Sequence, residues 1–298
     1  MKRVLFSLLT LGLAHGAHAD PVKAAAVQSQ RALGTQLRVA DGGWGSVSAQ
    51  EVERVLASVI QEFGGAAHDV PLPPVLVRHH FGSPLISYDR ALDGAYVIWL
   101  SARNDRWYQY VYQFSHELCH LLSRFDLKEH DGEVVRENQW FEESLCETAS
   151  LYALRRLAAN WAQSDADQDL QQAAPLLAKY ADTLLAQPHR ELPAGLSMSA
   201  WFAQNEDQLR REPYLRELNE LVAAQILPLF ERNPELWRAL AYLNVSAAPA
   251  HSQFYDYLAL WRAAAPQEFK PFVAELESLF GVGAQVEHLA SLPGIKSR

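Results

Sequence analysis

The sequence predicts an α+β protein that is mainly α-helical. We expect a small β-containing N-terminal lobe, a central pair of helices and an all-helical C-terminal lobe. Two observations predict this class. Short β-branched and aromatic runs, separated by Gly, Pro and Asp, lie between residues 75 and 100. After residue 160, apolar residues recur at helical spacing, and prolines lie near the expected helix ends.

Residues 1–19 are typical of a cleavable signal peptide. Lys2 and Arg3 precede a short apolar core over residues 4–14, and Ala17-His18-Ala19 is a small-x-small cleavage site. No later apolar run approaches about 18 residues, the length that a membrane span needs. We therefore expect cleavage after Ala19 and a mature chain, without a membrane span, that is periplasmic or secreted.

The net charge of the chain limits the kinds of partner that it can bind. The formal net charge of the whole chain is −9, and loss of Lys2 and Arg3 with the signal peptide makes it −11. An acidic chain without basic runs is a poor candidate for binding nucleic acid or an anionic membrane surface. With 49% hydrophobic residues, the chain has ample material for a core.

The N-terminal lobe is expected over residues 20–160. Ser48 and Glu51 form a capping box that opens a helix ending near Phe63, before Gly64-Gly65. The expected strands are 75–77, 85–88 and 94–100. The segment 96–100 is either an edge strand, which could pair with an extended peptide, or an interior strand.

Two central helices follow the strands. The first runs from about residue 106 to 123, is apolar nearly all round and should be buried. The second begins near Trp140, after a polar segment over 124–138. The C-terminal lobe, residues 161–282, is expected to contain helices 167–187, 198–210, 213–231, 234–243, 252–264 and 266–280. Residues 283–298 form a tail without a strong pattern.

The first central helix contains His116-Glu117-Leu118-Cys119-His120, an H-E-x-x-H motif. Histidines at i and i+4 project from one helix face and can bind one metal ion. Glu117 follows the first histidine and points roughly 100° away, so it lies beside the metal, where a general base for a water molecule belongs. The motif therefore predicts a catalytic zinc site.

A catalytic zinc site needs a third protein ligand. The extended motif with a third histidine is excluded, because Ser123 replaces its glycine and Asp126 replaces its last histidine. The second helix instead places Glu143 23 positions after His120, with Glu147 one turn later.

At this helix the chain resembles the gluzincin metallopeptidases, the clan of thermolysin and related zinc aminopeptidases. Trp140-x-x-Glu143-Ser144-Leu145-Cys146 is similar to their W-x-x-E-G-F-A pattern, and the resemblance covers about residues 94–157. It implies zincin-like helices and one Zn²⁺ ion held by His116, His120 and Glu143. It also implies Glu117 as general base and Glu147 as an acid that orients a ligand histidine.

The chain departs from this pattern at two places. The exopeptidase motif G-A-M-E-N is replaced by Gly94-Ala95-Tyr96-Val97-Ile98, which has no acid to hold a substrate amine. Glu142 replaces the asparagine that precedes the ligand in thermolysin-like sequences. Glu142 is therefore an alternative third ligand, and Glu137 a more distant one.

A donor for the transition-state oxyanion is the least determined part of the site. The candidates, of which we favour Tyr214 and His251, are His130, Tyr152, Tyr214, His251 and Tyr255. Cys119 and Cys146 each follow a proposed ligand by three positions. They are either joined in a disulfide or remain two buried thiols.

These observations predict an exported zinc metallopeptidase that hydrolyses peptide or protein substrates. One alternative is a non-catalytic zinc-binding or peptide-binding protein that retains a peptidase-like fold. Another is a hydrolase of a non-peptide amide, which would use the same site and a different pocket.

Overall fold

The computed structural model describes residues 37–63, 72–130, 133–134, 136, 138–164, 167–246 and 252–282. The predicted signal peptide, residues 1–19, and the predicted tail, residues 283–298, lie outside these ranges. Within the described part of the chain, no helix combines the length and apolar character that crossing a membrane requires.

A four-stranded sheet forms the N-terminal part of the fold. Its strands are β1 (Leu37–Val39), β2 (Val75–His79), β3 (Leu85–Arg90) and β4 (Tyr96–Leu100). The order is β1-β2-β4-β3, with the first three parallel and β3 antiparallel to β4. Strand β4 is therefore interior, because β2 pairs with one side of it and β3 with the other. The edge strand on this side is β3, so the edge alternative for residues 96–100 is wrong.

Helix α2 (Ala49–Glu62) packs against the sheet and the first central helix. Its predicted capping box is confirmed, since the Ser48 side chain accepts from the Glu51 backbone and the Glu51 carboxylate accepts from the Ser48 backbone. One helix face, carrying Val52, Val55 and Val59, is fully buried. This amphipathic face is what holds the helix on the sheet.

The two central helices are α4 (Trp107–Leu122) and α5 (Gln139–Ala162). Between them lie a 3₁₀ turn, Phe125–Lys128, and a short hairpin of β5 (Glu129–His130) and β6 (Glu133–Val134). Helix α5 is 24 residues long and packs on α4, α6 and α8. It is therefore the element that joins the N-terminal and C-terminal parts of the fold.

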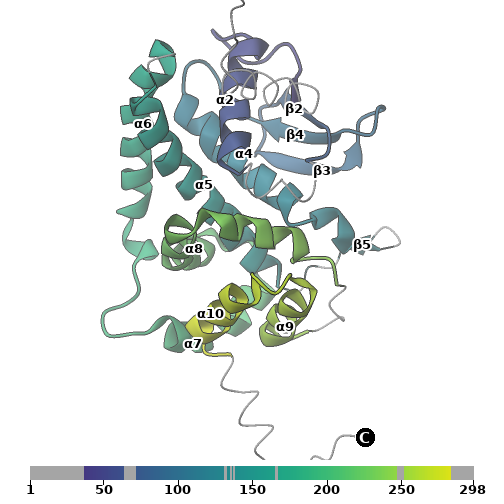
Figure 1. The fold of residues 1–298 in the computed structure, drawn as a ribbon, viewed down its shortest axis with the longest axis vertical. Coiled ribbons are helices and arrows are strands. Elements are labelled where there is room, and N and C mark those ends of the chain that lie inside the picture. The colour runs from purple at the N-terminus through teal and green to yellow at the C-terminus, as the bar shows by residue number, and fades with distance from the viewer. Residues whose placement is uncertain are drawn as a thin grey trace, which may run out of the picture.

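The rest of the described chain is helical, which confirms an α+β fold that is mainly α. Its helices are α6 (Gln168–Leu185), α7 (Met198–Arg211), α8 (Arg216–Arg232), α9 (Phe254–Ala264) and α10 (Lys270–Phe280), with 3₁₀ segments at Pro188–Arg190 and Pro234–Tyr242. In Figure 1 the sheet lies at the upper right, α6 at the left, and α7, α9 and α10 at the bottom.

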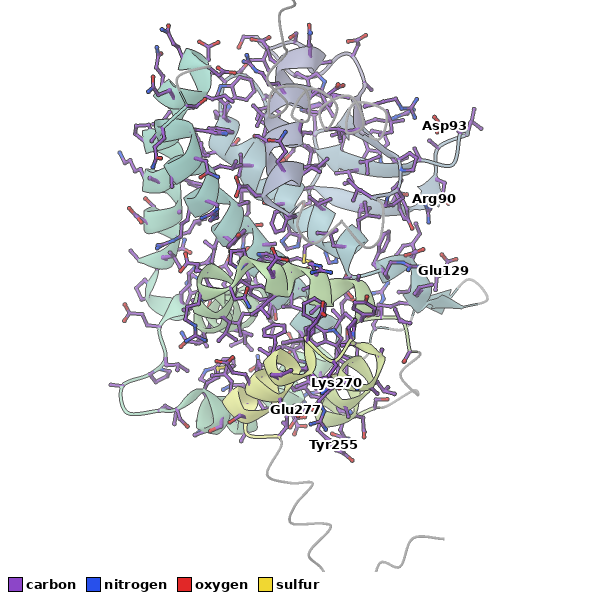
Figure 2. All side chains as sticks on the ribbon, viewed as in Figure 1. Arg90, Asp93, Glu129, Tyr255, Lys270 and Glu277 are labelled. Atoms are coloured by element: carbon purple, nitrogen blue, oxygen red, sulfur yellow. The ribbon has the colours of Figure 1, made fainter. Side chains whose placement is uncertain are left out.

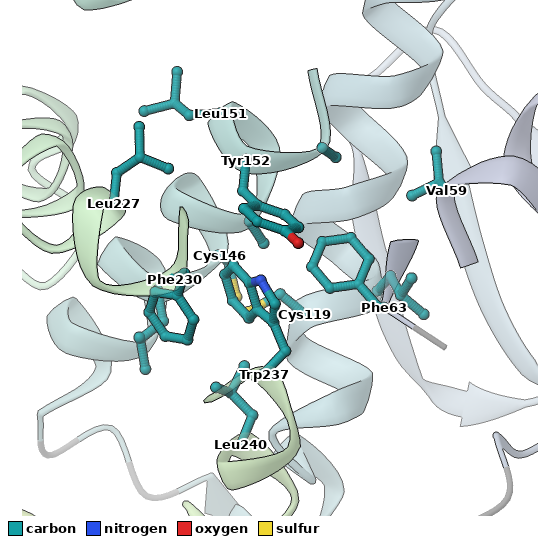
Figure 3. Close-up of a cluster of buried hydrophobic side chains, with 14 of the residues drawn as sticks. Val59, Phe63, Cys119, Cys146, Leu151, Tyr152, Leu227, Phe230, Trp237 and Leu240 are labelled. Carbon is teal, nitrogen blue, oxygen red and sulfur yellow. The ribbon is translucent and has the colours of Figure 1, made fainter. Parts of the chain in front are cut away.

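The buried apolar side chains form one continuous cluster from Leu37 to Val282. Figure 3 shows a part of it where Tyr152 and Trp237 lie close to the two cysteines. The Tyr152 ring lies 5.3 Å from that of Trp237 and 5.7 Å from that of Phe63. Tyr152 is thus a core residue, and the structure does not support it as an oxyanion donor.

Candidate metal centre

His116 and His120 lie on one face of α4, with ring centroids 5.2 Å apart. The helix is buried because it is apolar on most of its surface. His120 is buried with it and is 8% exposed. Buried imidazoles need polar partners, since an unpaired polar group in the interior is costly. Both rings find such partners on α5.

Glu143 on α5 faces both histidines. Its Oε2 lies 3.3 Å from Nε2 of His116, and its Oε1 lies 3.8 Å from Nε2 of His120. Gln139, one turn earlier, donates from Nε2 to the same Oε1 at 2.9 Å and helps to fix the carboxylate. Tetrahedral zinc with ligands at 2.0–2.1 Å separates neighbouring ligand atoms by about 3.4 Å. Glu143 therefore lies within reach of both imidazoles and is a candidate third donor to a metal ion between them.

A second donor set overlaps the first. Donor atoms of His116, His120 and Cys146 all lie within 4.8 Å of one another. Burial, followed by the hydrogen bond with Cys119, raises the pKa of the Cys146 thiol well above its ordinary value. Burial also works against the charged form of Glu143, but the charge of His120 and the hydrogen bond from His116 lower the pKa of Glu143 to about 2. The two sets share both histidines and differ in the third donor, which is the Glu143 carboxylate in one and the Cys146 sulfur in the other.

Cys119 and Cys146 are both free and buried, and their side chains are hydrogen-bonded to each other. They lie side by side where α4 and α5 pack together (Figure 3). Of the two alternatives from the sequence, this structure has two buried thiols and not a disulfide. The equal offsets from His116 and Glu143 nevertheless placed the two sulfurs correctly next to each other.

Glu142 has a different role from the one expected. Its Oε1 lies 2.7 Å from Nδ1 of His120, and its Oε2 accepts from Lys128 at 3.2 Å and from Asn244 at 2.9 Å. Burial opposes ionisation, yet the Lys128 ammonium and His120 lower the pKa of Glu142 to about 2. Since Nδ1 of His120 is bound by this carboxylate, Nε2 is left for a metal. Glu142 is therefore placed to orient the His120 ring, with Nε2 on the side of Glu143.

Glu147 does not contact a histidine, contrary to what the resemblance implied. Its carboxylate accepts hydrogen bonds from the hydroxyl of Tyr112 and, at 2.7 Å, from Nη2 of Arg190. Arg190 is 1% exposed and also pairs with Glu220 on α8 at 3.1 Å. The buried Arg190 guanidinium needs a countercharge, and Glu147 supplies it. The Glu147 carboxylate is therefore directed toward Arg190 and not toward His116.

Glu117 lies beside the proposed donors, as the motif predicts. It is 5% exposed. Burial is the main reason why the pKa of Glu117 is raised, although the two neighbouring histidines work in the opposite direction. A carboxylate with a raised pKa is better suited to accept a proton near neutral pH.

His116, Glu117 and Glu143 line a pocket of about 250 Å³. Residues from three helices and from the α7–α8 connection line it, among them His116, Glu117, Glu143, Glu147, Tyr214 and Arg216. Tyr214 is 57% exposed. Burial of part of its ring raises the pKa of Tyr214 above its ordinary value. A tyrosine hydroxyl is protonated at neutral pH even without this shift, and it can donate a hydrogen bond.

Of the other predicted donors, Tyr152 and Tyr255 are among the described residues, and neither lines this pocket. Tyr255 lies on α9, near the lower edge of the view in Figure 2, and is not part of the pocket lining. His251 and Glu137 lie outside the described residues, as does the side chain of His130.

Sequence reasoning missed five polar residues of the pocket, which are Tyr112, Gln113, Arg216, Asn219 and Glu220. Tyr112 had a local signal, because it lies one turn before His116 on the same helix face. Arg216 and Asn219 come from α8, about a hundred positions later, and no local spacing connects them with the motif.

No protein-family model matches the chain, and neither does any curated protein sequence. The likeness to gluzincins therefore depends on the residues of α4 and α5 alone.

Proposed function

We propose that the protein is a zinc-dependent peptidase of gluzincin type. The observation that carries the proposal is the convergence of His116, His120 and Glu143 at ligand spacing, with Glu117 beside them in a pocket. The closeness of these four side chains, which come from two helices, supports a mechanism of the H-E-x-x-H type.

His116, His120 and Glu143 would hold the zinc ion. When bound, zinc supplies Lewis-acid activation of a water molecule and of a substrate carbonyl. Glu117 would take a proton from that water onto a carboxylate oxygen and later deliver it to the leaving amine nitrogen. Glu117 is 5% exposed, which limits its contact with bulk water.

Neighbouring residues support this chemistry. The Glu142 carboxylate holds His120 with Nε2 available, and Lys128 and Asn244 hold Glu142. Tyr214 is the described hydroxyl best placed to donate to an oxyanion, since it lines the pocket and stays protonated at neutral pH. We further propose that the enzyme works outside the cytoplasm on peptides, as its signal-like N-terminus and acidic composition suggest.

Metal analysis combined with a peptide-hydrolysis assay tests this proposal. Glu117→Gln should retain stoichiometric zinc, because Glu117 is not a ligand, and should lose activity by a factor of roughly 100 or more. Glu275→Gln is a matched control, since Glu275 is exposed and its described ion pair, with Arg232, is on the surface. Equal hydrolysis by wild type and Glu117→Gln would refute the mechanism.

One observation favours a second candidate, a non-catalytic zinc-binding protein. If Cys146 joined His116, His120 and Glu143, four protein ligands would close the zinc site, as in structural zinc centres. X-ray absorption spectroscopy of the zinc-loaded protein separates the two. A first shell of nitrogen and oxygen only supports the peptidase, whereas a sulfur at about 2.3 Å supports the closed site.

A further inference from the structure

We propose that Arg216 and Asn219 on α8 form a subsite for a substrate carboxylate, in the same pocket as the proposed metal centre. The substrates would then be peptides that end in a free carboxylate at this position or carry an acidic side chain there. The inference rests on the proposed peptidase function, and it names the substrate class for that same pocket.

Arg216 is held in place at two of its nitrogens. Nε donates to Oε1 of Glu220 at 2.5 Å, and Nη2 donates to the hydroxyl of Tyr112 at 3.1 Å. Among the described residues, Nη1 has no hydrogen-bond partner within the protein, and the side chain is 69% exposed. A fixed guanidinium with a free donor edge is suited to binding a carboxylate.

Glu220 neutralises only part of the positive charge of Arg216. That carboxylate also pairs with the buried Arg190 at 3.1 Å and with Nε2 of His189 at 2.5 Å. Glu220 thus divides its charge among several partners. Of the described residues that line the pocket, Arg216 is the one with a permanent positive charge. An anionic group of a substrate has no comparable partner elsewhere in the lining.

Asn219 gives an independent indication that a ligand binds here. It lines the pocket and is 5% exposed. Its Nδ2 donates to the Pro213 carbonyl at 2.8 Å, which fixes the amide orientation, while its Oδ1 is buried and has no partner in the described structure. Buried acceptors without a partner are rare. A peptide N–H beside a carboxylate held by Arg216 would satisfy this one, since positions i and i+3 share a helix face.

Arg216 and the proposed metal centre share one pocket. Tyr112, which binds Arg216, lies one turn before His116 on the same helix face, and all three residues line the pocket. The pocket volume of about 250 Å³ suits a short segment of peptide.

Binding measurements test the subsite separately from catalysis. The zinc-loaded Glu117→Gln protein is titrated by calorimetry with an N-acetylated alanine tripeptide, as the free acid and as the C-terminal amide. We expect the acid to bind on the order of 10- to 100-fold more tightly. In the Glu117→Gln background, Arg216→Gln should remove this preference for the acid. Arg216→Lys in place of Arg216→Gln should restore part of the preference. Asn219→Ala should weaken binding of both peptides by similar factors, because both carry the N–H.

A second pair of peptides identifies the source of the carboxylate. Tripeptide amides ending in glutamate or glutamine test an acidic side chain in place of a chain terminus. A preference that depends on Arg216 in either pair supports the subsite and names its source. Arg232→Gln is the control, because Arg232 lies on the same helix with a similarly exposed side chain, paired with Glu275. It should leave both ratios unchanged.

The outcomes keep the two proposals apart. If Arg216→Gln folds with an unchanged melting temperature and alters neither ratio, or if no peptide binds, the subsite is refuted. If the ratios depend on Arg216 but zinc-loaded wild type cleaves none of the peptides, the subsite stands and the peptidase function falls.

Discussion

Glu142 offers the sharpest test of how the centre is built. Its side chain is 1% exposed and connects His120 with Lys128, which is 6% exposed. Glu142→Gln keeps the shape and removes the charge. We expect this change to have two separate effects, one on folding and one on metal binding.

The effect on folding follows from Lys128. Its ammonium would stay buried without a countercharge, and breaking a buried ion pair in this way costs about 3–5 kcal/mol. For a chain of this size, 1 kcal/mol corresponds to a shift of roughly 2–4 °C in Tm. Metal-free Glu142→Gln should therefore melt roughly 6–20 °C below wild type. The effect on zinc arises from the loss of a charged partner at Nδ1 of His120 and should lower affinity about 10- to 100-fold.

A double variant separates the two effects. Lys128→Met removes the buried ammonium, so Glu142→Gln with Lys128→Met should regain most of the lost stability. Its zinc affinity should stay as low as that of Glu142→Gln alone, because His120 still lacks the carboxylate. Thermal unfolding of metal-free protein and competition with a zinc chelator give the two numbers. If the double variant is no more stable than Glu142→Gln, or if zinc affinity is unchanged in both, the reasoning is wrong.

Three further predictions concern the ligands, the metal and pH. Glu143→Ala should lose stoichiometric zinc whereas Cys146→Ala should keep it, as measured by atomic absorption; the opposite result would make Cys146 the third ligand. Zinc at 1,000 times its Kd should add about 4 kcal/mol of stability, so excess chelator should lower the melting temperature; no change would contradict a bound metal. Burial opposes ionisation of Glu220, but the hydrogen bond from Arg216 and the charge of Arg190 lower the pKa of Glu220 below 4.5. This carboxylate thus stabilises the fold above pH 4.5, and the contribution is lost as pH falls through the lowered value, so Glu220→Gln should show a shallower acid loss in pH-dependent unfolding.

The fold was predictable where the signals were local. The capping box at Ser48 and Glu51 starts α2 as expected. Pro188, Pro213, Pro234 and Pro266 lie near observed helix ends, whereas Pro175 and Pro228 lie inside α6 and α8. Strand β1 was missed, because its three residues are too few to form a pattern. Whether β4 is interior depends on the order of strands that are distant in sequence, and its own residues do not determine that order.

The candidate site divides in the same way. Spacing on two helices was enough to bring His116, His120 and Glu143 together. The roles of Glu142 and Glu147 were not correctly predicted, because they depend on partners elsewhere in the chain. Asn244 and Lys128 hold one acid toward His120, and Arg190 and Tyr112 hold the other away.

The unbroken core from Leu37 to Val282 has a consequence for how a substrate enters. Enzymes that close on a substrate by a hinge motion need two domains with few contacts between them. Here α5 is packed against both ends of the molecule, so a hinge motion would expose apolar surface that folding has buried. Exposed side chains in the pocket lining can instead change position without uncovering the core, and Tyr214, with 57% of its surface exposed, is one of them.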